Sequence, residues 1–82
     1  MTLELYQEVA LTHDLPEHQL HKGDIVTLIE FVPHSTTGEQ GCVLEVFNAV
    51  GESIAIVAVP ESAIEALRAD EILTVRPFAQ AS

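Results

Sequence analysis

The residues of this sequence that could best do chemistry lie close together, between positions 13 and 24. They are three histidines and three acids: His13, Asp14, Glu17, His18, His21 and Asp24. Imidazole nitrogens and carboxylate oxygens are ligands that zinc accepts, and the same groups act as general acids and bases. A small metal-dependent or acid–base enzyme centred on His13, Asp14, Glu17 and His18 is therefore one hypothesis for this chain.

The spacing of these residues favours a structural role instead. The histidines are separated by five and then three residues, which matches no helical zinc signature such as His-Glu-x-x-His. A loop of this size also offers few neighbours to hold metal ligands in place. We expect Glu17 and His18 to anchor a turn through hydrogen bonds to the backbone, with Leu15 and Leu20 plugging the core on either side of Pro16. We expect no catalytic residue, no metal and no cofactor.

Two other positions have simple conformational or packing explanations. Gly23 precedes Asp24 at the entry to an apolar run, where glycine accepts the positive φ of a sharp turn and aspartate bonds the turn backbone. Cys42 alternates with Leu44 and Val46, as a small buried hydrophobe does. Acidic surroundings raise a thiol pKa, so cysteine catalysis is not expected.

The composition limits the class of partner. The chain has 82 residues, with thirteen acids against three bases and a formal net charge of −10. Phosphate backbones and anionic membranes bind Lys and Arg, so we expect neither nucleic acid nor membrane as a partner. The longest apolar run, 54–60, is too short to span a bilayer. The lack of a signal-type N-terminus and the single cysteine favour a cytoplasmic protein.

The rest of the chain reads as short apolar runs separated by turn signals. Alternation predicts five strands, at residues 7–12, 25–32, 42–48, 53–59 and 72–76. Ser62 and Glu65 fit a capping box, which predicts a short helix over 63–69 before the last strand. The whole chain, 1–82, is expected to form a single domain with its core over about 7–77.

These elements predict a mainly all-β fold, a small five-stranded SH3-like barrel with one short helix before the last strand. Such a barrel has a long first loop, a meander of strands two to four, and a helical turn before strand five. The expected core is an alternating apolar set: Val9, Leu11, Leu15, Ile25 or Val26, Leu28, Leu44, Val46, Ile56 and Ile64.

Strand 53–59 is apolar on both faces, and the interior of a small barrel can bury only one of them. The other face must be covered by the helix or by another molecule. We expect the helix over 63–69 to provide this cover, which favours a monomer. Without that cover, a homodimer would bury the same face. Val43, Glu45 and Phe47 share one side of strand 42–48, where Phe47 either packs under the helix or contacts another protein.

Three segments resemble a family of small bacterial proteins known as domain of unknown function 4926. They are Leu15–His18, Gly23–Asp24 and the closing Val75–Pro77, so the resemblance covers roughly residues 7–77. It implies an SH3-like barrel. It implies no activity, although the position of some members beside toxin-like genes suggests an antitoxin or immunity role.

The preferred hypothesis is a non-catalytic protein-interaction module. Its expected partner is a protein, basic because the chain is acidic, and encoded nearby. The candidate interaction residues are acids and a histidine of the loops together with two outward strand residues: Asp14, Glu17, His18, Glu39, Val43 and Phe47.

Overall fold

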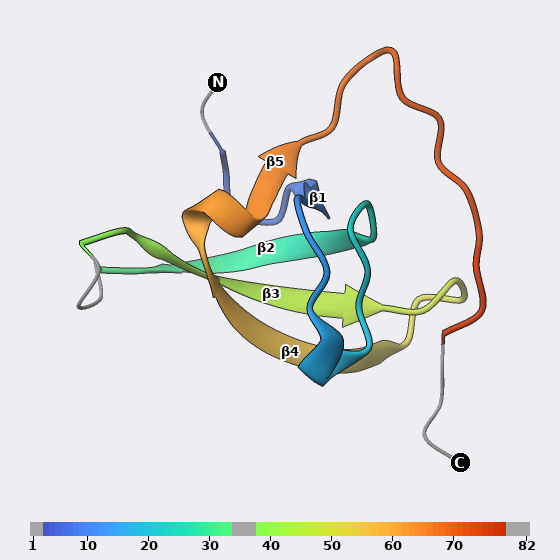
Figure 1. The fold of residues 1–82 in the computed structure, drawn as a ribbon, viewed down its shortest axis with the longest axis horizontal. Helices are drawn as coiled ribbons and strands as arrows, with labels where there is room; N and C mark the ends of the chain where they lie inside the picture. Colours follow the sequence, from blue (N-terminus) through green and yellow to red (C-terminus); the bar gives the residue numbers. More distant parts are fainter. Residues whose placement is uncertain (1–2, 34–37, 79–82) are drawn as a thin grey trace.

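The computed structural model describes residues 3–33 and 38–78, and it is built almost entirely from β-strands (Figure 1). The strands are β1 (Glu8–Leu11), β2 (Ile25–Val32), β3 (Gly41–Phe47), β4 (Ser53–Pro60) and β5 (Ile64–Ala66). Two short 3-10 turns, η1 (Pro16–His18) and η2 (Glu61–Ala63), precede β2 and β5. The predicted all-β class with five strands is confirmed.

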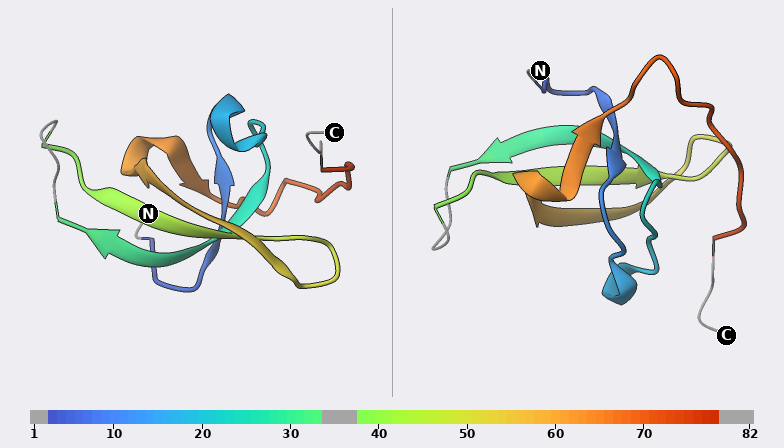
Figure 2. Two further views of the ribbon diagram at one scale, coloured as in Figure 1. Left: turned by 90° about the horizontal axis from the view of Figure 1, so that it is seen from below. Right: turned by 45° about the horizontal axis from the view of Figure 1, so that its top comes forward.

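All four strand pairings are antiparallel, and the strand order is β4-β3-β2-β1-β5. β2, β3 and β4 form one layer, and β1 and β5 cross one side of it (Figures 1 and 2). The long first loop, the β2–β4 meander and the helical turn before β5 follow the expected plan. The sheet is not closed, because no pairing in the described residues joins β4 to β5, so a complete barrel is not confirmed.

The core lies between these layers. It contains most of the expected residues and adds several inward residues of the first loop, β3, β4 and η2. The buried cluster is Val9, Leu11, Leu15, Leu20, Val26, Leu28, Cys42, Leu44, Val46, Val57, Val59, Ala63 and Ile64. The prediction that Ile56 lies in the core is wrong, because this residue is 61% exposed. Val57, its neighbour in the chain, is the inward residue because alternate residues of a strand point to opposite faces.

A bulge in β2 changes which residues face the core. Leu28 pairs with Leu44, but the next pairs are Glu30 with Val43 and Phe31 with Cys42, so Ile29 is an extra residue. One inserted residue reverses the alternation of a strand. Phe31 therefore packs against the core instead of sharing a face with Ile25, and Glu30 points outward.

The expected helix over 63–69 and the expected strand over 72–76 are both wrong. Ile64–Ala66 form β5 on the free edge of β1, while residues 72–76 have no regular structure. An isolated helix of two turns has little stability of its own, whereas β5 buries Ile64 in the core. The Ser62 amide is bonded by Glu39 Oε1 and not by Glu65, so the capping box is absent.

Candidate functional site

The first loop, residues 12–24, is held to the domain by two leucines. Leu15 and Leu20 are buried and pair with each other across η1, as expected for plugs on either side of Pro16. Pro16 occupies the first turn, where its fixed φ favours helical geometry. Gly23 leads into β2 with a φ of +90°, the positive value that its sequence position indicated.

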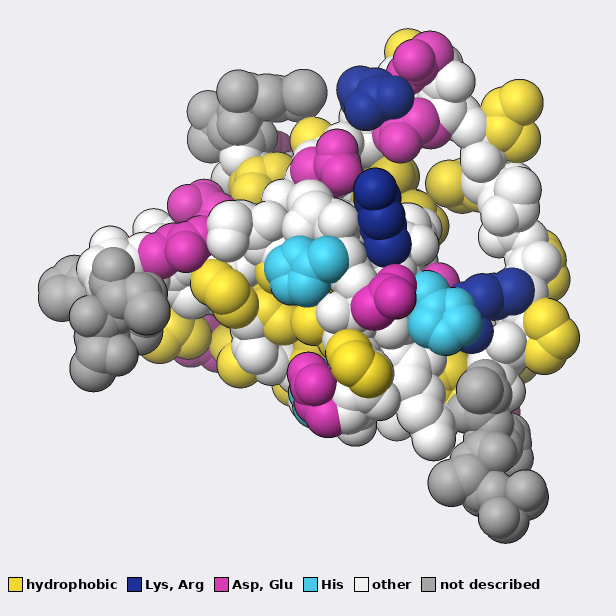
Figure 3. Space-filling model, viewed as in Figure 1, with side chains coloured by type: hydrophobic (Ala, Val, Ile, Leu, Met, Phe, Trp, Pro, Cys, Tyr) yellow, Lys and Arg dark blue, Asp and Glu magenta, His cyan; other side chains and the backbone are white. Residues whose placement is uncertain are grey.

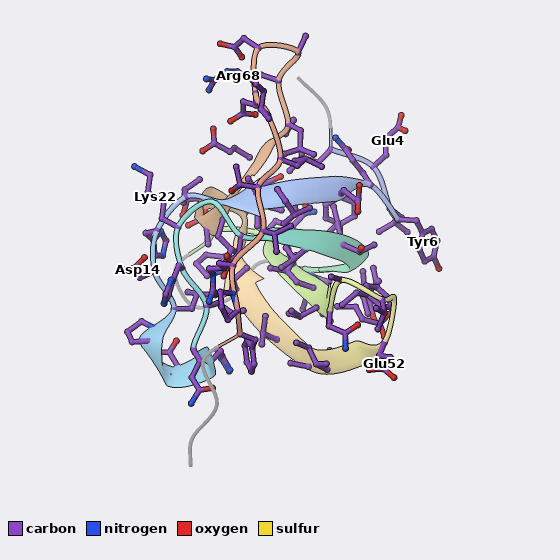
Figure 4. All side chains as sticks on the ribbon, turned by 90° about the vertical axis from the view of Figure 1, so that its right-hand side faces the viewer. Glu4, Tyr6, Asp14, Lys22, Glu52 and Arg68 are labelled. Atoms are coloured by element: carbon purple, nitrogen blue, oxygen red, sulfur yellow. The ribbon has the colours of Figure 1, made fainter. Side chains whose placement is uncertain are left out.

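The polar groups of this loop mostly satisfy backbone amides. Asp14 Oδ1 accepts a hydrogen bond from the Lys22 amide at 2.8 Å, and both residues lie on the same side of the domain (Figure 4). Asp24 Oδ2 accepts one from the His21 amide at 2.7 Å. Asp14 and Asp24 therefore anchor the loop. The expected anchoring by Glu17 and His18 is not observed, because among the described residues neither side chain has a hydrogen-bond partner.

The four residues of the enzyme hypothesis do not converge on one point. His13 Nδ1 lies 3.1 Å from Thr12 Oγ1, and Asp14 bonds a backbone amide as described. Glu17 and His18 lie exposed in η1. In residues 3–33 and 38–78, no group of three or more His, Cys, Asp or Glu is placed to hold a metal ion.

Asp24 also binds the end of the chain. Arg76 Nε donates to Asp24 Oδ1 at 2.9 Å, and Nη2 donates to Oδ2, which makes a two-pronged pair. Burial raises the pKa of the Asp24 carboxyl, but hydrogen bonds from Arg76 and the His21 amide outweigh burial and lower it below its ordinary value. The pair fastens residues 67–78, here called the tail segment, to the start of β2.

The tail segment stands away from the body of the domain along most of its length (Figure 3). Its apolar residues Ile72, Leu73 and Val75 are exposed, and a hollow of about 520 Å³ separates it from β1, β2 and β3. Phe78, beyond the Arg76 contact, lines a second hollow of about 390 Å³ with Phe47 and Ile54.

The side chains of Glu39 and Cys42 contribute to the structure of the domain. Glu39 Oε1 accepts a hydrogen bond from the Ser62 amide at 2.6 Å and so ties the β2–β3 connection to η2. Cys42 is fully buried, as predicted. Burial, and then the charges of Glu61 and Glu39, raise the pKa of its thiol. A protonated, buried thiol is a poor nucleophile.

The most exposed apolar surface of the sheet is the side of β3 and β4 that faces away from the core. We call it the outer face, and it comprises Val43, Glu45, Phe47, Ile54, Ile56 and Ala58. Phe47, Ile54 and Ile56 are 41%, 40% and 61% exposed. Val43 and Phe47 point outward, as expected, and no helix in residues 3–33 or 38–78 covers them. The cover on which the expected monomer depended is thus absent from the described chain.

The structure does not gather the six candidate interaction residues into one site. Val43 and Phe47 lie on the outer face, Asp14, Glu17 and His18 on the first loop, and Glu39 beside η2. Ile54, Ile56 and Glu45 were missed as contact candidates. The apolar character of both faces of strand 53–59 was the available signal.

The fold and this surface define a small all-β domain with an open five-stranded sheet and an exposed apolar face. The chain belongs to the family described as domain of unknown function (DUF4926), whose model matches residues 5–66. The match ends at the last residue of β5, so Val75–Pro77 and the rest of the tail segment lie beyond it. No curated protein and no solved structure matches the chain. None of the helices in the described residues is long and apolar enough to cross a membrane.

Proposed function

We propose that this chain is a non-catalytic protein-interaction module that binds another protein through its outer face. The observation that supports this is the exposure of Phe47, Ile54 and Ile56 on neighbouring strands, with no helix or strand of the described chain packed over them. Contiguous apolar surface rimmed by polar residues is typical of protein-binding sites. Aromatic residues such as Phe47 are enriched at the centres of such sites.

The partner should have an apolar contact surface with a basic rim. Glu45 lies within the outer face opposite Ile56, and Glu30 lies outward beside Val43. Within the described residues neither carboxylate has an ion-pair partner. With a formal net charge of −10, the chain attracts a basic surface and repels an acidic one. Asp14 and Glu17 on the first loop add to this attraction from a distance.

The finer form of the proposal is an antitoxin-type, immunity-type or accessory role. In that role the module binds a toxin or an enzyme encoded nearby, and it acts in the cytoplasm. The net negative charge of the chain favours a toxin or enzyme with a basic surface as the partner. The single cysteine is consistent with a reducing compartment.

Affinity capture with matched baits tests the proposal. The baits are the wild-type chain, an outer-face variant with Phe47→Ala and Ile54→Ala, and a control with Ile72→Ala and Val75→Ala. The control removes two apolar side chains of the tail segment that are even more exposed, at 88% and 90%, than Phe47 and Ile54. A protein retained by the wild type and the control but lost by the outer-face variant supports the proposal.

The association rate of that protein should fall as the salt concentration rises, because rim charges act mainly on encounter. Reversing Asp14 and Glu17 to lysine should slow association further, whereas reversing Glu65 and Asp70 should change it little. The proposal fails if every bait retains the same proteins equally, or if the captured protein is itself acidic and associates at a rate independent of salt.

A further inference from the structure

The two edge strands of the sheet differ in how they are protected from pairing with another chain. β5 is three residues long and carries Glu65 at its centre. β4 is eight residues long, carries no charge and has its only proline at its last position. Natural proteins block edges with short strands, charges, prolines or bulges. Beyond the irregularity opposite Val46 and Phe47 and the proline at its last position, the edge of β4 has none of these protections.

The register of β4 shows which of its backbone groups face outward. The Glu61 amide donates to the Gln40 carbonyl at 2.9 Å, so these residues form a hydrogen-bonded pair. Such pairs alternate along an antiparallel ladder. The backbone groups of Val57 and Val59 therefore point toward β3, and those of Ile56 and Ala58 point toward the free edge. An added strand would find two adjacent sets of donors and acceptors that no strand of the described residues pairs with.

We propose that this edge pairs antiparallel with β4 of a second copy of the chain. A pairing centred on Val57 sets Ile56 of each copy opposite Ala58 of the other, so the outward groups of the two copies satisfy one another. This symmetry is what a twofold interface requires.

The charge distribution favours a second copy at this place on the surface. Two copies with a net charge of −10 repel each other over most orientations. The nearest acids along the chain, Glu52 and Glu61, stand immediately outside the two ends of β4 and leave eight uncharged residues between them. Glu52 and Asp14 of the first loop lie on opposite sides of the domain in Figure 4. The edge of β4 is thus a long surface over which like-charged copies can approach closely.

Sedimentation of the full-length chain at micromolar concentration tests this inference. We expect a dimer that strengthens as salt is added, because salt screens the repulsion between the acidic copies. Binding of a basic partner should respond to salt in the opposite direction. Backbone pairing should also slow hydrogen exchange at the Ile56 and Ala58 amides as the protein concentration rises.

Two variants with the same change of charge separate association at β4 from association through the tail segment, and the exchange measurement separates edge pairing from contact through the outer face. Ile56→Lys places a charge near the axis in both copies and should weaken the dimer by at least about tenfold. Ile72→Lys, on an 88% exposed side chain of the tail segment, should leave it unchanged. Far-ultraviolet circular dichroism should show that both variants are folded, since both positions are exposed.

A chain that stays monomeric in high salt at micromolar concentration overturns the inference. A dimer that tolerates Ile56→Lys also overturns it and points to contact through the tail segment. A dimer without slowed exchange at Ile56 and Ala58 overturns it too, and points to contact between side chains of the outer face or of the tail segment. The test uses purified protein alone, so its failure leaves the proposed binding of another protein to be decided by the capture experiment. The inference does not depend on that proposed function.

Discussion

The two faces of the β3–β4 pair are both rich in apolar residues, but the strands of the described residues cover only one of them. Leu44 and Val57 face inward and are buried, whereas their neighbours Ile56 and Phe47 face outward and are exposed. The difference arises from the second layer, because β1 and β5 cross only one side of β2, β3 and β4 (Figure 2). In a domain of this size, one pair of crossing strands cannot cover both sides of a sheet.

The largest expected effect comes from shortening an inward leucine. Leu44→Ala should lower the free energy of unfolding by about 2–5 kcal/mol, because it leaves a cavity among fully buried neighbours. Ile56→Ala, on the next strand but on the outer face, should change it by less than about 0.5 kcal/mol in the monomer. Urea denaturation at low protein concentration measures both. Similar losses for the two variants would show that the outer face is covered in solution.

A matched pair of phenylalanines sharpens the comparison. Phe31 packs against the core after the β2 bulge, and Phe47 lies on the outer face. Phe31→Ala should therefore cost about 2 kcal/mol and Phe47→Ala about half as much. Thermal unfolding of the two variants under identical conditions checks the order. If Phe47→Ala is the more destabilising, packing around Phe47 contributes more than its exposed fraction suggests.

The last prediction concerns the Asp24–Arg76 pair, which holds the tail segment. The folded pKa of Asp24 is lowered, so its contribution to stability is present above about pH 4, the ordinary pKa of aspartate, and is lost as the pH falls through the lower folded value. Arg76→Ala should cost about 1 kcal/mol at neutral pH, since the pair is only partly buried. The difference between wild type and variant should shrink in acid. A difference that is constant from neutral pH down to pH 2 would contradict this assignment.

The first four strands could be predicted from the sequence because alternation over four to eight residues is a strong local signal. β2, for example, has the predicted bounds, Ile25–Val32. The last strand could not be predicted, because three residues are too few to show a period. Ile64 and Leu67 fit a helix equally well by spacing. The choice between helix and strand is made by the free edge of β1, which lies more than fifty residues earlier in the chain.

The candidate site was predictable only in part, for similar reasons. Alternation correctly placed Val43 and Phe47 outward. It could not say which face of β4 would be covered, since that depends on the path of β1 and β5. The bulge at Ile29, which sends Phe31 inward and Glu30 outward, has no local signal in an unbroken apolar run. The Asp24–Arg76 contact joins segments 52 residues apart and is equally invisible to local patterns.

That separation has a kinetic consequence. The tail segment makes no strand pairing of its own, so the contact between Asp24 and Arg76 gains nothing until β2 and the first loop are in place. Closing a loop of this length costs entropy, and this cost is offset only when the rest of the domain has assembled. We therefore expect the pair to form after the folding transition state and to be among the first contacts to break. Its loss should speed unfolding while leaving the folding rate almost unchanged. The pair then contributes to the kinetic stability of the folded domain and not to the rate at which the domain forms.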